Sequence, residues 1–338
     1  MSIVRFSHPP VIAASASVVG KKEHDGPLGD LFDMHDETDS FGKESWEQSE
    51  AEMQRLALNL ALKKGNMNPD TVEALFSGDL MNQCISSNYG LLSFSIPFFG
   101  LYGACSTCAE GLILSSMLIA GGIYSRCAAV TSSHNCSAER QFRFPLEYGG
   151  QRTPTAQWTV TGSGAFIVDR DGDGPRIAEV LPGISVDLGI TDINNMGAAM
   201  APAAVDTLTR YFRESHTDPA SFDRIITGDL GYEGHSIVLD LMKKRGYDLS
   251  ANYNDCGLLV CSRKQQDMHA GGSGCGCSAV VLSAYLLNEL KRGGMKNILF
   301  LGTGALMSTV AVQQKQSIPG IAHLVRLCGG NAERTEGR

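Results

Sequence analysis

The sequence predicts an α/β fold made of two similar halves, and three features of the chain support this prediction. Predicted strands alternate with predicted helices along most of the 338 residues, which is typical of a mostly parallel sheet covered by helices on both faces. Glycines cluster where hydrophobic strands end, and α/β proteins bind their ligands at such positions. Both halves run from a strand through a glycine-rich turn into a helix, with the division near residues 169–174, "DRDGDG". We therefore predict an N-terminal half at 1–172, a C-terminal half at 173–327 and a polar tail at 328–338.

The N-terminal half begins with a predicted strand at 9–20, "PPVIAASASVVG". Residues 21–50 contain ten acidic side chains and few aliphatic ones, which predicts an acidic insertion at the surface. A helix follows, because Ser49 and Glu52 have the spacing of a capping box and Gly65 can end it. The other predicted elements of this half are a strand at 71–80, a helix at 104–121, a strand at 127–133, a polar loop that ends near 162, and a strand at 164–171.

The C-terminal half shows the same alternation, and glycines end two of its helices. Gly246 follows one of these helices, and Gly293 and Gly294 follow the other, as expected for residues that leave a helix. The predicted elements are a strand at 176–187, a helix at 197–216, a strand at 222–231, helices at 235–246 and 279–294, and a strand at 296–304.

The composition excludes several classes of protein. The chain is 43% hydrophobic and 19% charged, with a net charge of −8, and it has no Lys/Arg cluster of the kind that binds nucleic acid. Its ten cysteines are too few for a disulfide scaffold, and we expect reduced thiols in a cytosol-like compartment. The N-terminus lacks the apolar core of a signal peptide. The apolar run at 112–123 contains two serines and two glycines, and we expect a buried helix rather than a membrane span.

Cys105 is the first candidate functional residue, and its surroundings allow four interpretations. It opens a long apolar helix, where the helix N-terminus favours the thiolate of a nucleophile. Cys105 and Cys108 also form a CxxC pair, which is typical of redox proteins. A buried, inert cysteine is the third interpretation. Zinc bound by Cys105, Cys108, Cys275 and Cys277 is the fourth, although the CxC spacing is poor for a zinc ribbon.

The segment at 131–165 is the second candidate region, because it is dense in side chains that hold anions. Arginine grips a carboxylate through two parallel hydrogen bonds, and long irregular loops are often functional. Four aromatic residues in the segment argue against a merely solvated loop. The anion-binding candidates are Ser132, Ser133, His134, Arg140, Arg143, Gln151 and Arg152.

Three motifs resemble the thiolase and β-ketoacyl-ACP synthase superfamily. "GACSTCAEGL", residues 103–112, is similar to its nucleophile motif, with Cys105 in the nucleophile position. "VTGSGAFIV", residues 160–168, resembles the strand that closes the first half, and "FLGTGALMS", residues 300–308, resembles the C-terminal glycine loop. The resemblance extends to about residue 327. It implies a thiolase-like fold, in which two pseudo-symmetric α/β halves form a layered αβαβα core.

Within this superfamily the chain resembles the stage V sporulation protein AD family of spore-forming bacteria. The motifs that carry this resemblance are "GPLGDLFD" at 26–33, "TSSHN" at 131–135, "AERQFRFP" at 138–145, "EYGGQR" at 147–152, "TAQWTVTG" at 155–162 and "ITGDLG" at 226–231. The resemblance implies a binding protein for dipicolinic acid, a pyridine dicarboxylate that is loaded into the developing spore. It implies as partners the other membrane proteins of the stage V sporulation A operon. Peripheral association with the inner forespore membrane would then occur through these partners, since the chain has no anchor of its own. A homodimer is a further possibility.

The expected ligand site is a condensing-enzyme pocket that is reused for binding. Cys105 and Ser106 would line it at the helix N-terminus, which favours a ligand carboxylate, with Asp229 and Gly304 contributed by the second half. His134 and either Arg143 or Arg152 would hold the other carboxylate. No other cofactor is expected, but dipicolinate chelates calcium and calcium is a possible co-ligand. The acidic insertion lacks an EF-hand pattern, so we assign no metal ligands.

The resemblance also shows which catalytic partners are replaced. Condensing enzymes of the superfamily use a His and an Asn, or two His, to polarise the thioester carbonyl. The matching stretches here place Gly228 or Asp229 at the first position and Gly272 at the second. Losing one such donor costs on the order of 10²–10³ in rate. We therefore expect no catalytic residue, unless His235 or His269 occupies a vacated position. The alternative is an acyltransferase or ketoacyl synthase-like condensing enzyme that uses Cys105 as its nucleophile.

Overall fold

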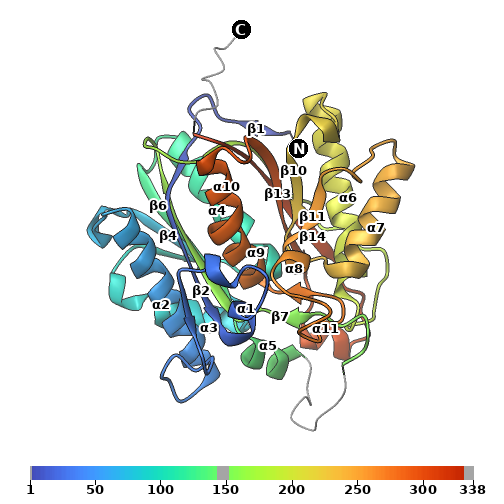
Figure 1. Cartoon of the computed structure of the whole chain (residues 1–338), viewed down its shortest axis with the longest axis horizontal. Coiled ribbons are helices and arrows are strands. Elements are labelled where there is room, and N and C mark those ends of the chain that lie inside the picture. The colour runs from blue at the N-terminus through green and yellow to red at the C-terminus, as the bar shows by residue number, and fades with distance from the viewer. Residues whose placement is uncertain (1, 143–151, 331–338) are drawn as a thin grey trace.

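The computed structural model describes residues 2–142 and 152–330 (Figure 1). The strands are β1 Val4–Arg5, β2 Val11–Gly20, β3 Met34–Asp36, β4 Ala74–Gly78, β5 Phe98–Gly100, β6 Arg126–Ser133, β7 Trp158–Thr159, β8 Gly162–Asp169, β9 Arg176–Leu181, β10 Arg224–Thr227, β11 Tyr253–Asp255, β12 Gly272–Ser273, β13 Asn297–Ala305 and β14 Gly320–Cys328. The α-helices are α1 Lys21–His24, α2 Trp46–Lys64, α3 Ile85–Gly90, α4 Thr107–Ala120, α5 Asn135–Phe142, α6 Met196–Ser215, α7 Gly231–Lys244, α8 Cys256–Leu259, α9 Cys275–Val281, α10 Leu287–Arg292 and α11 Thr309–Gln313. The 3₁₀ turn η5, Ala104–Ser106, leads directly into α4, and a π-helical turn, Leu282–Leu286, joins α9 to α10.

The main sheet repeats one strand order in its two halves. The first half has the order β5-β4-β6-β8-β2 and the second has β11-β10-β13-β14-β9, with β2 and β9 joining the halves. Each half therefore uses equivalent strands in equivalent places, a relationship that residue identities do not reveal. The two-stranded ribbon of β7 and β12 lies outside this sheet.

The prediction of a mostly parallel sheet is correct only toward the outer edges. β4 pairs in parallel with β5 and β6, and β10 pairs in parallel with β11 and β13. The pairs β6–β8, β8–β2, β13–β14 and β14–β9 are antiparallel. The reason is that β8 and β14 each pair with the main-sheet strand that comes just before them along the chain. β8 runs back alongside β6, and β14 runs back alongside β13. A parallel neighbour would require a crossover to the opposite end of the sheet.

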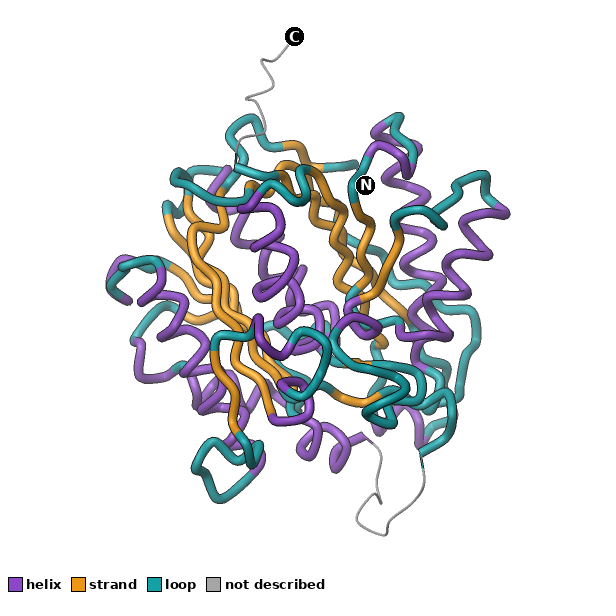
Figure 2. The backbone as a smooth tube through the Cα atoms, in the orientation of Figure 1, coloured by secondary structure: helices purple, strands orange, loops and turns teal. Residues whose placement is uncertain are grey.

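Five layers result from this arrangement (Figure 2). Helices α4, α9 and α10 lie between the two halves of the sheet, α2 covers the outer face of the first half, and α6 and α7 cover the second (Figure 1). α4 is apolar around most of its circumference, as a helix between two sheets must be. Its residues Leu112 and Ile113 belong to the central core with Val280, Leu287 and Phe300. The layers are those of an αβαβα core.

α2 begins earlier than its sequence predicts. The helix starts at Trp46, and Ser45 is its N-cap, with Oγ accepting a hydrogen bond from the Gln48 N–H at 3.3 Å. The predicted cap, Ser49, lies one turn inside the helix and donates its hydroxyl proton to the backbone carbonyl of Ser40 at 2.8 Å. Ser45 and Ser49 both lie shortly before acidic residues in a polar segment, so the local sequence pattern is compatible with either serine as the N-cap of α2. The predicted end at Gly65 is confirmed.

Two predicted irregular segments are partly ordered into elements. In the acidic insertion, β3 pairs in parallel with β2, and Glu23 of α1 is fully buried. The prediction of a solvated surface insertion therefore holds only for part of its length. The predicted polar loop contains α5, whose buried face consists of Ser137, Ala138 and Glu139. The helix has only eight residues, and Ala138 is the one apolar side chain of that buried face, which is why a pattern search misses it.

No helix in the described part of the chain is both long enough and apolar enough to cross a membrane.

Candidate functional site

The turn before α4 holds Cys105 at the wall of a pocket. Ala104 has a φ of +52°, a left-handed conformation that is strained for a residue with a side chain and often occurs at functional sites. β13 approaches this turn closely at Gly304. A Cβ atom at that position would lie 2.9 Å from the carbonyl oxygen of Gly103 and 3.0 Å from the Ser106 nitrogen. Gly304 therefore allows the strand to pack against the cysteine turn.

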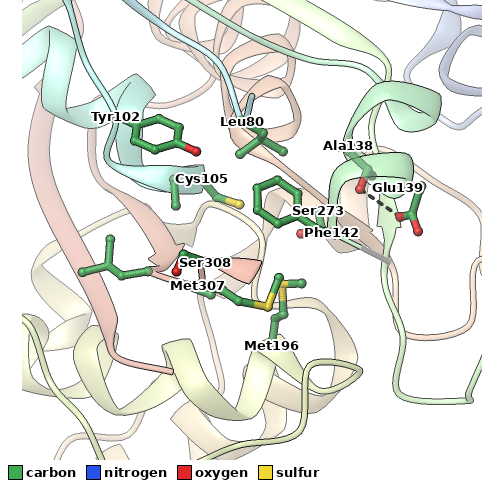
Figure 3. Close-up of a pocket in the computed structure, with 14 residues that line it drawn as sticks. Leu80, Tyr102, Cys105, Ala138, Glu139, Phe142, Met196, Ser273, Met307 and Ser308 are labelled. Carbon is green, nitrogen blue, oxygen red and sulfur yellow. Dashed lines mark hydrogen bonds between the residues drawn. The ribbon is translucent and has the colours of Figure 1, made fainter. Parts of the chain in front are cut away.

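The pocket has a volume of about 220 Å³ and collects residues from both halves of the fold. In Figure 3 the Cys105 sulfur points into the space between Phe142, Ser273 and Leu80, with Met196 and Met307 on the facing wall. The side chains are mostly apolar, with a minority of hydroxyl groups and one carboxylate. The lining residues are Leu80, Tyr102, Ala104, Cys105, Ala138, Glu139, Phe142, Thr159, Met196, Ser273, Ala305, Leu306, Met307 and Ser308.

Asp229 lies directly behind Cys105 and is held by several donors. It follows β10, and its Oδ2 accepts hydrogen bonds from the Ser273 hydroxyl at 3.0 Å and the Gly274 N–H at 2.9 Å. Its Oδ1 accepts one from Thr303 Oγ1 at 2.8 Å, and the Cys105 thiol is a fourth donor. Hydrogen-bond donors around a carboxyl group favour its ionised form, whereas burial disfavours that form.

Burial and Asp229 together keep the Cys105 thiol protonated. Burial raises the pKa of Cys105 well above its ordinary value, and the Asp229 carboxylate raises it further, both by charge and by accepting the thiol hydrogen bond. Burial also raises the pKa of Asp229, while its hydrogen bonds oppose that rise. The helix N-terminus was expected to favour the thiolate, and the structure shows that these two effects outweigh it.

At the second replaced catalytic position, Gly272, the side chain that reaches the pocket belongs to the next residue, Ser273, which the sequence analysis did not identify. Gly272 is buried behind the pocket, where a Cβ atom would lie 2.7 Å from Val260 Cγ1. Ser273, the next residue, lines the pocket and donates to Asp229. A strand alternates its side chains between faces, so a shift of one residue decides which side chain reaches Cys105.

The other four predicted binding residues have four different placements. Ser106 is fully buried beneath the pocket and donates its hydroxyl proton to the Gly103 carbonyl at 2.6 Å. His134 is fully buried outside the pocket, with Nε2 2.9 Å from the Asp39 carbonyl oxygen and Nδ1 accepting from the Cys136 N–H. Arg152 lines a different cavity, and Arg143 falls outside the described residues. The structure thus brings together Cys105 and Asp229, with Gly304 and Ser106 packed beside them, but neither His134 nor Arg152.

Neither histidine that could restore catalysis reaches Cys105. His235 stacks on Tyr253 with ring centroids 4.5 Å apart, and burial lowers the pKa of His235. His269 lies at the cavity of Arg152, with Nδ1 2.9 Å from the Thr153 carbonyl oxygen. No general base of this type lines the Cys105 pocket among the described residues.

The metal and redox interpretations of the cysteines also lack support. All ten cysteines are free thiols, and no group of three or more His, Cys, Asp or Glu side chains could hold a metal ion within the described residues. Cys108 is fully buried, and burial raises its pKa to about 12. A CxxC redox pair needs an accessible thiol of lowered pKa, which is the opposite of what is found here.

One carboxylate belongs to the described lining of the pocket. Glu139 on α5 lines it and accepts a hydrogen bond from Thr159 Oγ1 at 3.1 Å (Figure 3). No arginine or lysine belongs to the described lining. The expected pairing of a ligand carboxylate with an arginine in this pocket is therefore not seen among these residues.

Comparisons with known proteins agree on family and fold. A family model described as stage V sporulation protein AD matches residues 1–328. The chain is 44% identical to stage V sporulation protein AD of Bacillus subtilis (strain 168) over 318 residues, which cover 94% of each chain. Among solved structures, it is similar to 3-oxoacyl-[acyl-carrier-protein] synthase III of Aquifex aeolicus VF5, with a TM-score of 0.55, 13% identity and coverage of 94% and 99% of the two chains. It is also similar to a variant of Xanthomonas campestris OleA, with a TM-score of 0.60, 14% identity and coverage of 96% and 99%. These neighbours confirm the thiolase-like α/β fold class.

Proposed function

The chain belongs to the stage V sporulation protein AD family, and from this premise we propose that it is a non-catalytic binding protein for dipicolinic acid in the spore's uptake machinery. The ligand would occupy the Cys105 pocket, with Cys105 as a vestigial nucleophile. Membership of the family makes the chain a sporulation protein. The identity of the ligand is the proposal.

The contact between Asp229 and Cys105 is the main observation that supports a non-catalytic role. Acyl transfer needs a thiolate and donors aimed at the developing oxyanion. Here the carboxylate raises the pKa of the thiol and itself accepts every hydrogen bond it makes. A negative charge beside an oxyanion opposes the transition state that a condensing enzyme must stabilise.

The size and lining of the pocket support a small, flat ligand. Its volume of about 220 Å³ is below the roughly 300–1,000 Å³ of pockets that take drug-sized ligands. Phe142 and Tyr102 offer aromatic surface, while Ser273 and Ser308 offer hydroxyl groups that can donate to carboxylates. One aromatic ring with two small polar substituents matches this combination.

The Glu139 carboxylate at the pocket wall favours a ligand whose charge is already neutralised. A bare dianion close to this carboxylate would be repelled by it. Calcium bound by the two carboxylates and the ring nitrogen of dipicolinate would remove that repulsion. The Glu139 carboxylate is then a suitable neighbour for the ion, since calcium prefers oxygen ligands. We therefore propose that calcium enters with the ligand, as cargo.

The binding test is a calorimetric titration with dipicolinate, with and without calcium. We expect saturable heat that is stronger with calcium and is lost when Ala138→Trp fills the pocket. Cys328→Ala, a substitution in β14, is the matched control and should bind as the parent does. Absence of heat at millimolar ligand in both conditions, with a folded protein, would overturn the proposal.

A second candidate function is supported by the fold alone. The solved neighbours include a 3-oxoacyl-[acyl-carrier-protein] synthase, so acyl transfer through Cys105 is the alternative. Incubation with acyl-CoA followed by intact-mass measurement separates the two functions. We expect no acyl adduct. An adduct that Cys105→Ala abolishes, together with turnover, would favour the enzyme.

The partners and location are further proposals that follow from the family. We propose peripheral association with the inner forespore membrane through the membrane proteins of the stage V sporulation A operon. A homodimer is the other proposed assembly, and the β5 edge of the sheet supports it. Phe98 and Phe99 of β5 are 37% and 46% exposed, and Tyr102 beyond them is 53% exposed. Contiguous exposed aromatic side chains on an open sheet edge are typical of an interaction surface.

A further inference from the structure

We propose that Asp255 is a positioning residue of the Cys105 pocket, because its carboxyl group holds the turn that carries Asp229 against Cys105. Asp255 is the last residue of β11 and is fully buried. It lies outside the described lining of the pocket, and no sequence motif singles it out. The assignment rests on the proposed function in one respect only, namely that the Cys105 pocket is the functional site.

The turn between β10 and α7 carries Asp229, and Asp255 holds this turn on both sides of that residue. Thr227 Oγ1, at the end of β10, donates a hydrogen bond to Asp255 Oδ2 at 2.6 Å. The Leu230 N–H donates to the same oxygen at 2.9 Å, and the Gly231 N–H donates to Oδ1 at 3.0 Å. One side chain therefore fixes the backbone immediately before and after Asp229.

The sequence of α7 explains why an outside residue is needed there. Its N-cap is Leu230, which has no side-chain oxygen to accept a hydrogen bond. The first N–H groups of a helix have no partner within the helix, and a buried N–H without a partner is costly. Asp255 supplies the missing acceptor, and it also accepts from the Gly257 N–H at 3.0 Å as the N-cap of α8. One carboxyl group thus caps two helices, whose N-termini favour a negative charge.

The strands on either side of β10 hold the Asp229 turn between them. β11 pairs in parallel with β10 and places Asp255 opposite Thr227. β13 also pairs in parallel with β10 and contributes Thr303. The Asp229 N–H donates to Thr303 Oγ1 at 3.0 Å, and this hydroxyl donates to Asp229 Oδ1 at 2.8 Å. Thr303 therefore orients the Asp229 carboxyl group, while Asp255 fixes the backbone from which it projects.

The two carboxyl groups also influence each other by charge. Burial raises the pKa of Asp255 to about 7, its hydrogen bonds oppose that rise, and the Asp229 charge adds to it. The interaction is mutual, so removing the Asp255 charge would ionise Asp229 more fully. An ionised Asp229 raises the pKa of the Cys105 thiol. Charge alone therefore predicts that Cys105 becomes less reactive without Asp255, whereas positioning predicts that it becomes more reactive.

Alkylation of Cys105 in Asp255→Asn distinguishes these two effects. The amide group of asparagine has a single acceptor oxygen, so it cannot accept at both edges as the carboxyl group does. One side of the turn is then no longer held, and Asp229 moves away from the thiol. We expect the Cys105 rate at fixed pH to rise roughly tenfold, as a fall of one pKa unit gives, and its pH profile to shift to lower pH. Peptide mass spectrometry measures the rate, with Cys328 as the internal reference.

A double-mutant cycle shows whether Asp255 acts through Asp229. Asp255→Asn added to Asp229→Asn should leave the Cys105 rate of Asp229→Asn unchanged, because the contact is already lost. Rate increases that multiply would show a general loosening of the fold and would overturn the proposal. Thr207→Val is the matched control for lost stability, since it removes another buried hydrogen bond in the same half. It should keep the parent's Cys105 rate.

An unchanged or slower Cys105 rate in folded Asp255→Asn would also overturn the proposal. If this variant does not fold, Thr227→Val takes its place, because it keeps the shape of the side chain and removes the 2.6 Å hydrogen bond to Asp255. Its Cys105 rate should rise several-fold in the parent and not in Asp229→Asn, and an unchanged rate in the parent would count against Asp255 in the same way.

These measurements use no dipicolinate, so their outcome is separate from that of the proposed function. Non-additive rates together with absence of calorimetric heat would reject dipicolinate binding and keep Asp255 as the positioning residue. Saturable heat together with an unchanged Cys105 rate in Asp255→Asn would reject the role of Asp255 alone.

Discussion

The Asp229 carboxylate accepts the hydrogen bond of the Cys105 thiol, and both groups are buried between the two halves of the fold. Cys105 comes from the turn before α4 and Asp229 from the end of β10, so their contact depends on the packing of one half against the other. In this arrangement the carboxylate suppresses the nucleophile, and the predictions below start from that relationship.

Removing the charge at position 229 should make Cys105 more reactive. In Asp229→Asn the carboxylate no longer raises the pKa of the thiol, and each unit by which the pKa falls multiplies the thiolate fraction about tenfold. The rate of Cys105 alkylation at fixed pH, measured by peptide mass spectrometry, should therefore rise. Cys328 is the internal control and should keep its rate. An unchanged Cys105 rate in a folded variant would show that Asp229 does not control the thiol.

Neutralising the acidic wall of the pocket should change its preference for calcium. Glu139→Gln keeps the shape of the side chain and the acceptor for Thr159, but removes its negative charge. We expect calcium-free dipicolinate to bind more tightly, and the calcium chelate more weakly, each on the order of several-fold. Calorimetric titrations with and without calcium measure both, with Glu110→Gln as the control. A shift of both affinities in the same direction would contradict the role of charge.

Glu23 should make the protein less stable as the pH rises. Burial raises the pKa of Glu23 from 4.5 to about 8, so the folded state holds a proton that the unfolded state releases between these values. The free energy of unfolding should therefore fall with rising pH across that window, by up to about 1.4 kcal/mol per pH unit from this group. Below pH 4.5 both states hold the proton and the dependence disappears.

Urea unfolding of Glu23→Gln measures this effect. The variant should gain stability relative to the parent at the upper end of the window and little at its lower end. Glu44→Gln, at an exposed position, should leave the pH dependence unchanged. A Glu23→Gln variant with the parent's slope would refute the assignment.

The exposed edge of β5 should control self-association. If two copies meet there, Phe99→Lys places a charge in the interface and should raise the dimer dissociation constant by roughly tenfold or more. Sedimentation velocity over a range of concentrations measures it. Val310→Lys, another exposed apolar position, is the control. A parent protein that stays monomeric at every concentration would remove the homodimer and leave the edge for a different partner.

Much of the fold could be predicted because local patterns carry it. The apolar run of α4, the alternating residues of β2 and the glycines after strand ends define elements that the structure confirms. The direction of β8 and β14 could not be predicted in the same way. It depends on which strand each one pairs with across the chain, and no local pattern encodes that choice.

The residues of the candidate site could be predicted only where a single residue has a recognisable position in the sequence pattern. Cys105 opens its helix and lines the pocket, and Asp229 follows its strand and lies directly behind Cys105. Glu139 and Ser273 were missed, because they reach the pocket from a short, polar helix and a two-residue strand. His134 and Arg152 have suitable chemistry, but His134 contacts the Asp39 carbonyl oxygen and Arg152 lies over the Trp158 ring.

The central claim is that dipicolinate occupies the Cys105 pocket without reacting there, and a crystal structure grown with calcium dipicolinate tests it most directly. We predict electron density for one planar ring between Phe142, Ser273 and Met307, with calcium on its carboxylate side and an unmodified Cys105 thiol. A pocket that stays empty at saturating ligand, or a covalent adduct on Cys105, would contradict the account.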